Sequence, residues 1–248
     1  VGWIVLTRPS QINAINDEIR QGVPLALRAL DADQTIGAIV IRGEGERGFC
    51  AGADIKEQRG PETSIEVRQR IEANRWVESL DQVQKPVIAA IHGYTMGGGL
   101  ELALACDIRF ASPNIVVSLP ETGLGLIPGG GGTQRLPRIV GMARAMDMML
   151  TGERLEAEEA RVIGLVTRVA TSAETHLAEV AELAALIARR PPVATRYVKR
   201  AVRAAADMDL NKGMDLELDF FALLKTSADA KEAASAFKEK RAAIFTGK

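Results

Sequence analysis

The chain has 248 residues and a formal net charge of −1, with 31 lysines and arginines against 32 aspartates and glutamates. This length suits one large α/β domain or two small ones, and 47% hydrophobic against 25% charged residues is the balance of a folded globular protein. The composition excludes a disordered or collagen-like chain. The balanced charge disfavours a dedicated nucleic-acid binder, which would carry an excess of basic residues.

The cysteine content and the hydropathy indicate in which cellular compartment the protein is expected. Cys50 and Cys106 are too few for a disulfide framework and lack the spacing of a metal site. The most apolar stretch, residues 86–104, contains three consecutive glycines and a glutamate, so it does not predict a membrane helix. We therefore expect a cytoplasmic protein without a bound metal. The chain starts at Val1, without Met and inside an expected strand, so we expect that leading residues are missing and leave a removed targeting segment open.

Short β-branched runs bounded by glycine, proline or charge predict strands in the first two thirds of the chain. Helical spacing of apolar residues predicts helices over residues 17–30 and 64–80, the first with a kink or break at Pro24. The alternation predicts a layered α/β domain. The predicted strands are residues 3–7, 38–42, 87–91, 108–111 and 166–169.

Strand signals end near residue 172, and the rest of the chain is helical in pattern. Pro191 and Pro192 end the first of these helices, while Ser227 and Asp229 form a good N-cap and first turn for the last. We expect a core of residues 1–190 with the active site, and a helical region of residues 191–248 that packs on its own core or on a neighbouring subunit. The predicted helices are residues 173–188, 194–206, 210–224 and 228–245.

The first glycine-rich segment, residues 43–48, formally matches the dinucleotide-binding pattern GxGxxG. Two glutamates would face the pyrophosphate there, and no apolar helix follows. A turn at the end of a strand is therefore the better interpretation.

The second segment is Gly97-Gly98-Gly99, between the strand at 87–91 and a predicted helix over residues 100–106. The glycines permit close approach of a ligand to the backbone, and the unpaired N–H groups of the helix start suit a developing oxyanion. Glu101 in the first turn has two interpretations: a catalytic carboxylate, or an acid that stabilises the helix dipole.

The third segment carries Glu121 before a glycine run at residues 129–132 and another helix. No Lys-Ser or Lys-Thr follows the glycines, which excludes a phosphate loop. Two glutamates beside two glycine-rich backbones suit paired acid–base catalysis, and a solvated loop carboxylate is the alternative for Glu121. Spacing alone leaves open whether the two carboxylates converge.

Three motifs, FCAGADIK at residues 49–56, IHGY with GGGLELA at 91–103, and PE with IPG and GTQRL at 120–136, resemble the enoyl-CoA hydratase (crotonase) family in order and spacing. The segments 6–14 and 236–241 resemble its first strand and last helix. The resemblance implies an α/β spiral of repeated ββα units with a C-terminal all-helical region that builds trimers, often paired into hexamers. It also implies an acyl-CoA thioester as substrate, with no separate cofactor because coenzyme A is part of the substrate.

By motif position, the resemblance implies that Glu101 and Glu121 are the catalytic carboxylates and that the N–H groups of Ala53 and Gly98 form the oxyanion hole. Gly129 falls where a backbone N–H meets substrate and water. Ser10 stands where relatives often carry a lysine that contacts the CoA phosphates, so this contact is expected to pass to lysines elsewhere. The other substrate contacts implied are Ala51, Asp54, Ile55 and Lys56, and, from a neighbouring copy, Phe237 and Lys240.

Glutamate at both positions favours a hydro-lyase that adds water to a trans-2-enoyl-CoA, in fatty acid β-oxidation or related catabolism. Alternatives on the same scaffold are an enoyl-CoA isomerase, a carnitinyl-CoA dehydratase and an acyl-CoA hydrolase; an RNA-binding or structural relative is disfavoured by the charge. His92 is expected to be structural and residues 142–149 to form a methionine-rich packing face. The depth of the acyl pocket is expected to depend on the segment after Lys56, residues 58–61.

Overall fold

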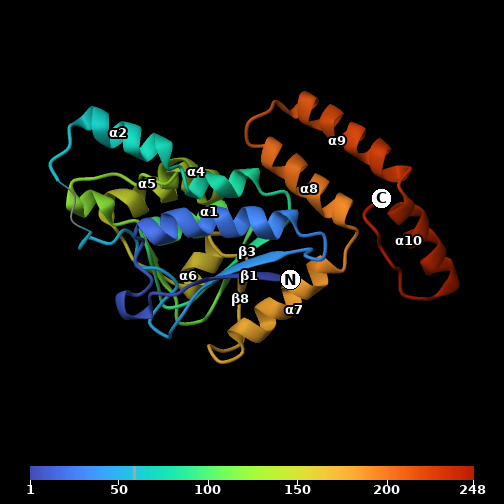
Figure 1. Ribbon diagram of the computed structural model, residues 1–248, viewed down its shortest axis with the longest axis horizontal. Helices are drawn as coiled ribbons and strands as arrows, with labels where there is room; N and C mark the ends of the chain where they lie inside the picture. Colours follow the sequence, from blue (N-terminus) through green and yellow to red (C-terminus); the bar gives the residue numbers. More distant parts are fainter. Residues whose placement is uncertain (58–59) are drawn as a thin grey trace.

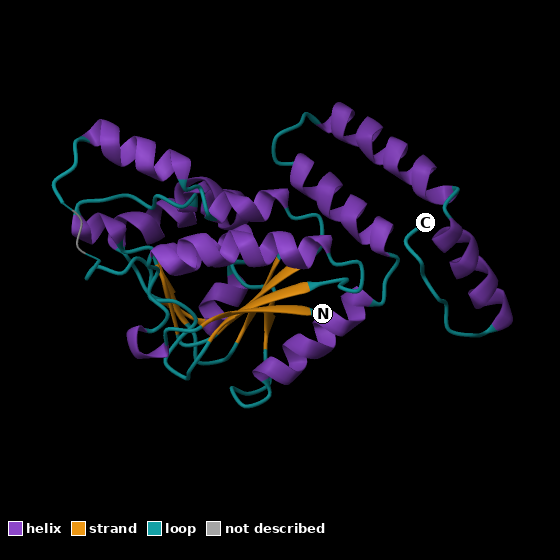
Figure 2. Cartoon of the chain, in the orientation of Figure 1, coloured by secondary structure: helices purple, strands orange, loops and turns teal. Residues whose placement is uncertain are grey.

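A five-stranded parallel sheet forms the centre of the molecule, in the order β1-β2-β3-β5-β8 (Figures 1 and 2). The computed structural model describes residues 1–57 and 60–248. All five strands lie where the sequence predicts them, and β3 is buried along its whole length, as in a parallel sheet covered on both faces. The strands are β1 (Gly2–Leu6), β2 (Ile39–Gly43), β3 (Val87–Ile91), β5 (Ile108–Ala111) and β8 (Arg168–Val169).

A smaller three-stranded sheet lies beside the central one and was not predicted. It pairs β4 (Tyr94–Met96) with β6 (Val116–Ser118) in parallel and β6 with β7 (Leu155–Glu156) in antiparallel fashion. Strands of two or three residues are too short for a period to be recognised in sequence. The small sheet matters for the site because β4 leads directly into the helix α3 (Gly98–Ala105).

Helix α1 (Asp17–Ala32) covers one face of the central sheet and begins at Asn16, whose side chain accepts a hydrogen bond from the N–H of Ile19. Of the kink or break predicted at Pro24, the break is wrong, because the helix continues through that residue, and the kink stays a prediction. Ile19, Val23 and Leu27 are all buried against the core, and this packing holds the helix across the one hydrogen bond that proline cannot donate.

The helix predicted over residues 64–80 is two elements, which corrects the sequence interpretation. Helix α2 (Ser64–Ala73) begins with a capping box between Thr63 and Glu66. It ends where Asn74 leaves the helical conformation, and a 3-10 helix, η2 (Val77–Gln82), follows. The buried side chains in this stretch, Val77 and Leu80, belong to η2.

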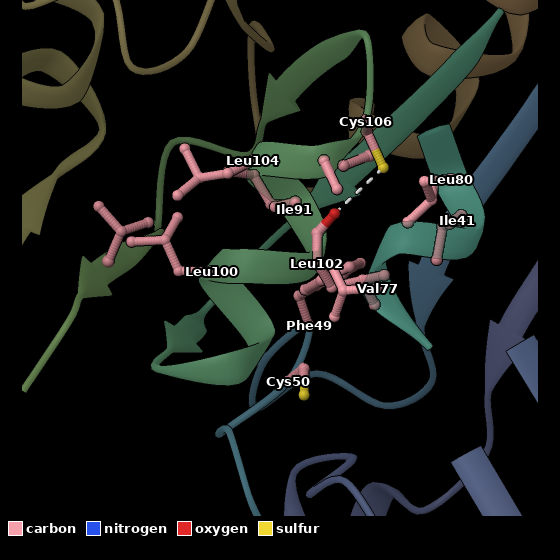
Figure 3. Close-up of a cluster of buried hydrophobic side chains, with 14 of the residues drawn as sticks. Ile41, Phe49, Cys50, Val77, Leu80, Ile91, Leu100, Leu102, Leu104 and Cys106 are labelled. Carbon is pink, nitrogen blue, oxygen red and sulfur yellow. Dashed lines mark hydrogen bonds between the residues drawn. The ribbon is translucent and has the colours of Figure 1, made fainter. Parts of the chain in front are cut away.

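Two hydrophobic clusters lie on opposite faces of the sheet. The larger holds α1 and α3, whose side chains are apolar apart from Glu101, and Leu102 of α3 lies near Phe49 and Val77 (Figure 3). The smaller is covered by α7 (His176–Ala188), on the side of the sheet away from α1 in Figure 1. Alternate side chains of one strand therefore enter different clusters, as the pleat requires.

Helices α4 (Gly132–Val140), α5 (Met142–Thr151) and α6 (Ala157–Val162) complete the core. The expected methionine packing face is only partly right. Met148 is fully buried, whereas Met142 and Met146 are 76% and 55% exposed. The three residues are spaced so that one face of the short helix meets the core and the other meets solvent.

The C-terminal helices extend from the core as an arm, with α8 (Pro192–Ala204) beside α9 (Leu210–Lys225) and α10 (Ala228–Glu239) at its end (Figure 1). Tyr197 and Phe220 stack at 4.5 Å between α8 and α9, but neither helix has a buried residue. Pro192 is the first residue of α8, a position that suits proline. The expected boundary of the region, after residue 190, stays a prediction.

The last helix is shorter than predicted. Ser227 caps it as expected, accepting from the N–H of Ala230, but α10 ends at Glu239 because Lys240 adopts a left-handed conformation with φ of 52°. The final residues then fold back, and the buried carboxylate of Asp229 accepts the N–H groups of Thr246 and Gly247. In the described ranges, no helix is long and apolar enough to cross a membrane.

Candidate active site

The site is built around the glycine turn between β4 and α3. Gly97 has a φ of 51°, a conformation that side chains disfavour, and its N–H donates to the carbonyl of Ser118 at 2.9 Å. A Cβ on Gly99 would collide with the carbonyl of Cys50. These glycines let the start of α3 approach the segment around residues 50–53, which a larger residue would prevent.

The backbone amides of Ala53 and Gly98 lie close together. A Cβ on Gly98 would be 3.9 Å from the nitrogen of Ala53, and a Cβ on Gly52 would be 3.5 Å from the nitrogen of Gly98. The N–H of Ile15 donates to the carbonyl of Gly52 at 2.8 Å, and this bond fixes the strand that carries Ala53. Within residues 1–57 and 60–248, neither amide donates to a protein acceptor. Two free donors therefore stand at the positive end of α3.

Glu101 is the one charged residue of α3, and it is 4% exposed. Its Oε1 accepts hydrogen bonds from the N–H groups of Gly130 at 2.7 Å and Gly132 at 2.8 Å. Burial raises the pKa of Glu101, while these two N–H groups and the nearby guanidinium of Arg135 oppose that shift. The glycine run at 129–132 therefore serves as the cradle for this carboxylate.

Glu121 opens a 3-10 helix, η3 (Glu121–Leu124), on the other side of the same turn. A Cβ on Gly97 would lie 3.1 Å from its Oε1, whereas a Cβ on Gly98 would lie 3.9 Å from Oε2 of Glu101. Oε2 of Glu121 is buried and has no hydrogen-bond partner among the described residues. Burial raises the pKa of Glu121, a hydrogen bond with its own backbone opposes that shift, and the charge of Glu101 raises the pKa further.

The two carboxylates, which the sequence left unplaced, thus lie beside one turn in unequal surroundings. Two N–H donors favour the ionised form of Glu101, while the unpaired oxygen of Glu121 favours a protonated group. A base beside an acid, next to free amide donors, can add or remove the elements of water or shift a proton along an acyl chain.

The loop after Ala53 holds most of the other predicted contacts. Asp54 pairs with Arg8 at 2.9 Å, which holds the pKa of that carboxyl below its usual value, and its second oxygen accepts the N–H of Lys56 at 3.1 Å. Asp54 therefore fixes the loop, and Ala51 is fixed by donating to the carbonyl of Ile12. The other three, Ile55, Lys56 and Gly129, are exposed, and the pocket segment 58–61 includes residues 58–59, which lie outside the described residues.

Three residues shape this site that the sequence did not assign to it. Arg8 pairs with Asp54, and Arg135 donates to the carbonyl of Gly130. The buried amide of Asn13 donates towards the carbonyls of Glu44, Gly48 and Phe49 and so ties the first loop to the one that carries Ala53. All three lie in segments that resemble the family, and nothing in the spacing of those segments indicates the contacts.

Phe237 and Lys240 do not reach the carboxylates of their own chain. Both belong to the end of the arm, where α10 packs on α9, and Phe237 is 86% exposed. In Figure 1, α9 and α10 lie on the opposite side of α8 from α4 and α5. Their predicted contact with CoA would therefore be made on a neighbouring copy.

His92 lies outside the carboxylate site. It forms a 2.8 Å hydrogen bond with the carbonyl of Gly45, in the loop at 43–48. No helix opens in that loop, so the turn interpretation of its glycines is confirmed. Over the described part of the chain, no group of three or more His, Cys, Asp or Glu is arranged to hold a metal ion.

Comparisons with known proteins cover the whole chain. The family described as enoyl-CoA hydratase/isomerase matches residues 1–248. The chain is 41% identical over 245 residues to a mitochondrial enoyl-CoA hydratase of Pongo abelii, covering 99% of this chain and 83% of that protein. It is 38% identical over 246 residues to a crotonyl-CoA hydratase of Syntrophomonas wolfei, covering 99% and 94%. A crystal structure of an enoyl-CoA hydratase from Bacillus anthracis matches with a TM-score of 0.93 at 37% identity, covering 99% and 95%.

Proposed function

Because the chain belongs to the enoyl-CoA hydratase/isomerase family, we propose that it adds water to trans-2-enoyl-CoA thioesters, giving 3-hydroxyacyl-CoA. Family membership and the α/β fold with C-terminal helices, both expected from the motifs, are confirmed by these similarities. The observation that carries the proposal is the pair of carboxylates, Glu101 and Glu121, on either side of a turn that also offers free amides.

The steps follow from the two environments. The thioester oxygen accepts hydrogen bonds from the amides of Ala53 and Gly98, which withdraws electrons from the C2=C3 bond. Glu101 takes a proton from water as the water oxygen bonds to C3, and the electron pair of the double bond moves towards C2 and the thioester oxygen. Glu121 then delivers its proton to C2. One water is consumed, and exchange with solvent returns the proton from Glu101 to Glu121.

Isomerisation of the double bond is the second candidate, because the family includes isomerases. That reaction moves one proton between two carbons and consumes no water, so a single carboxylate suffices. Here the second carboxylate, Glu101, is buried and held by two N–H groups. Isomerisation does not require this second carboxylate, whereas hydration does. The paired arrangement therefore favours hydration.

The test is a panel of trans-2-enoyl-CoA chain lengths, followed by the loss of enone absorbance, with 3-enoyl-CoA substrates in parallel. The proposal expects loss of absorbance and a 3-hydroxyacyl-CoA product. If the enone persists and 3-enoyl-CoA is converted to it, the isomerase assignment replaces the hydratase. The chain length with the highest kcat/KM would also define the depth of the acyl pocket.

The cofactor, the assembly and the CoA contacts expected from the sequence are part of the same proposal. Water addition requires only proton transfers, so we propose no cofactor besides the CoA of the substrate. Exposed apolar residues on α8 and α9, such as Val198, Val202 and Phe221, support assembly into a homotrimer or a hexamer. Lys56 and, across the boundary between copies, Lys240 would meet the phosphates in place of the lysine missing at Ser10. Nucleic-acid binding is not proposed, and a cytoplasmic location and a role in β-oxidation stay predictions.

A further inference from the structure

The cradle of Glu101 has no side chains of its own to keep its shape. Gly130 and Gly132 donate to the carboxylate, and Gly131 between them has a φ of 98°, which glycine tolerates best. A run of glycines loses much conformational entropy when it is fixed in one geometry. Something outside the run must therefore hold the two N–H groups in place.

Arg135, in the first turns of α4, makes this contact. Its Nη1 donates to the carbonyl of Gly130 at 3.0 Å, and its Nη2 pairs with Oδ2 of Asp81 on η2 at 2.8 Å. The guanidinium lies so close over the turn that a Cβ on Gly131 would collide with it. Gly130 is thus bound on both sides: its N–H by Glu101 and its carbonyl by Arg135.

We propose that Arg135 is a positioning residue for Glu101: its guanidinium clamps the glycine turn against η2 and places a positive charge near the carboxylate. The rigid fork of arginine suits this task, because one group bonds a carbonyl and a carboxylate at once. The inference rests on the proposed hydratase function for its kinetic test only, since the clamp itself is a contact of the free protein.

The charges that face Glu101 come from three elements. Arg135 on α4 lowers its pKa, Glu78 on η2 raises it, and Glu121 on η3 is coupled to it by repulsion. Removal of Arg135 therefore takes away the positive charge that lowers the pKa of this buried carboxylate and leaves the negative charges of Glu78 and Glu121. The pKa of Glu101 should rise, and because the ionised form serves as base, the acidic limb of the kcat/KM profile should move to higher pH.

The experiment compares Arg135→Gln, Arg135→Lys and a matched control, Arg138→Gln, on crotonyl-CoA. Arg138 lies one turn further along α4 and, among the residues that the structure describes, donates only to the carbonyl of Gln134. We expect Arg135→Gln to lower kcat by about 10- to 100-fold with little change in KM, and to shift the acidic limb upward. Arg135→Lys keeps the positive charge but loses the forked guanidinium. The acidic limb of its kcat/KM profile should therefore lie at the wild-type pH, while its kcat should stay below the wild-type value. Arg138→Gln should resemble the wild type.

A second readout separates the inference from the proposed function. The titration of Glu101, followed by carboxyl ¹³C NMR and assigned with Glu101→Gln, should move to higher pH in Arg135→Gln, whatever the enzyme's reaction. An unchanged titration, or kinetics of Arg135→Gln that match those of Arg138→Gln, would overturn the clamp. Absence of hydration by the wild type would overturn the proposed function alone. If Arg135→Gln does not fold, Arg135→Lys decides: a full kcat would refute the clamp.

Discussion

Glu101 is buried and Glu121 half-buried beside one turn, and their carboxyl oxygens have different hydrogen-bond partners. Glu101 receives two N–H groups, and Glu121 has a buried oxygen with no partner within the described residues. An unpaired carboxylate oxygen away from water is costly, so this environment favours the protonated form of Glu121, whereas the two N–H groups favour the ionised form of Glu101. This asymmetry supports the proposed roles of Glu101 as the base and Glu121 as the acid.

The pair predicts a bell-shaped pH dependence. The working form carries one proton on two coupled carboxyls, so activity falls in acid when a second proton binds and falls in base when the last one leaves. Since burial raises the pKa of each group above 4.5, both limbs of kcat/KM should lie above the ordinary range of glutamate. A profile measured on crotonyl-CoA with its acidic limb below that range, or with no basic limb, would contradict this account.

The proposed oxyanion hole predicts that removing the N–H of Gly98 lowers turnover, whereas adding a side chain that keeps the N–H does not. Proline removes its N–H while suiting the first position of α3. Alanine keeps the N–H, and its Cβ would press on the movable end of Ile15 at 2.9 Å and lie in ordinary contact, at 3.9 Å, with the nitrogen of Ala53 and with Oε2 of Glu101. Gly98→Pro should lower kcat by roughly 100- to 1,000-fold, the typical cost of one oxyanion donor. Gly98→Ala is the control and should retain most of the turnover. Steady-state kinetics on folded variants decide, and equal rates in both would remove the Gly98 amide from the site.

At this scale, the sequence could indicate which residues matter but not how they are held. The motifs placed both glutamates and Gly98 beside glycine runs. The unpaired oxygen of Glu121, and the clamp of Arg135 on Gly130, depend on contacts between segments separated in the chain, which no local pattern encodes.

Helix α8 is attached to the core by charge rather than by an apolar face. Asp107, at the end of α3's connection to β5, pairs with Lys199 and Arg203 of α8, each at 2.8 Å, and also accepts the N–H of Val87. The apolar residues Val198 and Val202 of the same helix are 62% and 68% exposed. Ion pairs therefore hold α8, the first helix of the arm, on the core, while Val198 and Val202 of this helix remain exposed.

Asp107→Asn should loosen α8. It removes the carboxylate from two cations, one of them nearly buried, and should lower the free energy of unfolding by about 2 kcal/mol. The matched control is Asp147→Asn, which breaks the more exposed pair with Arg144 and should cost less than about 0.5 kcal/mol. Urea unfolding measures both, and hydrogen exchange should show the added opening in α8. Equal small effects would mean that the charged cluster does not hold the arm.

Element prediction succeeded where the signal was long or strongly buried. The central strands carry apolar β-branched runs, and β3 and β5 match their predicted bounds. The short strands β4, β6 and β7 have no period to detect. The helix does not break at Pro24 because the packing of α1 on the core overrides the local preference of proline. Residues 64–80 do not form one helix because Asn74 ends α2 within an apolar pattern that continues beyond it.

The whole molecule consists of a packed core and an arm whose apolar residues have no cover in one copy. The outermost helix, α10, packs on α9 rather than on the sheet. Phe237 and Lys240 on or after it are exposed and distant from the carboxylates of their own chain. The proposal that the arm joins copies and completes a neighbour's CoA site rests on this arrangement.

Deletion of residues 228–248 should therefore abolish trimers and weaken CoA binding together. Sedimentation gives the assembly and calorimetry with CoA gives the affinity. The double variant Phe237→Ala, Lys240→Ala is the control, because it removes the proposed CoA contacts and leaves the rest of α10; it should stay trimeric while binding CoA less tightly. A monomeric truncated protein with unchanged affinity would show that the arm contributes no part of the site.

The most direct test of the two-carboxylate claim is the hydration of crotonyl-CoA by Glu101→Gln and Glu121→Gln, followed at the loss of enone absorbance. Each amide preserves shape and removes the ability to exchange a proton, so each variant should lose about 100- to 10,000-fold in kcat, the typical contribution of one acid or base. The double variant should lose less than the product of the two, because the carboxyls act as a pair. Hydration at close to the wild-type rate by either folded single variant would contradict the mechanism.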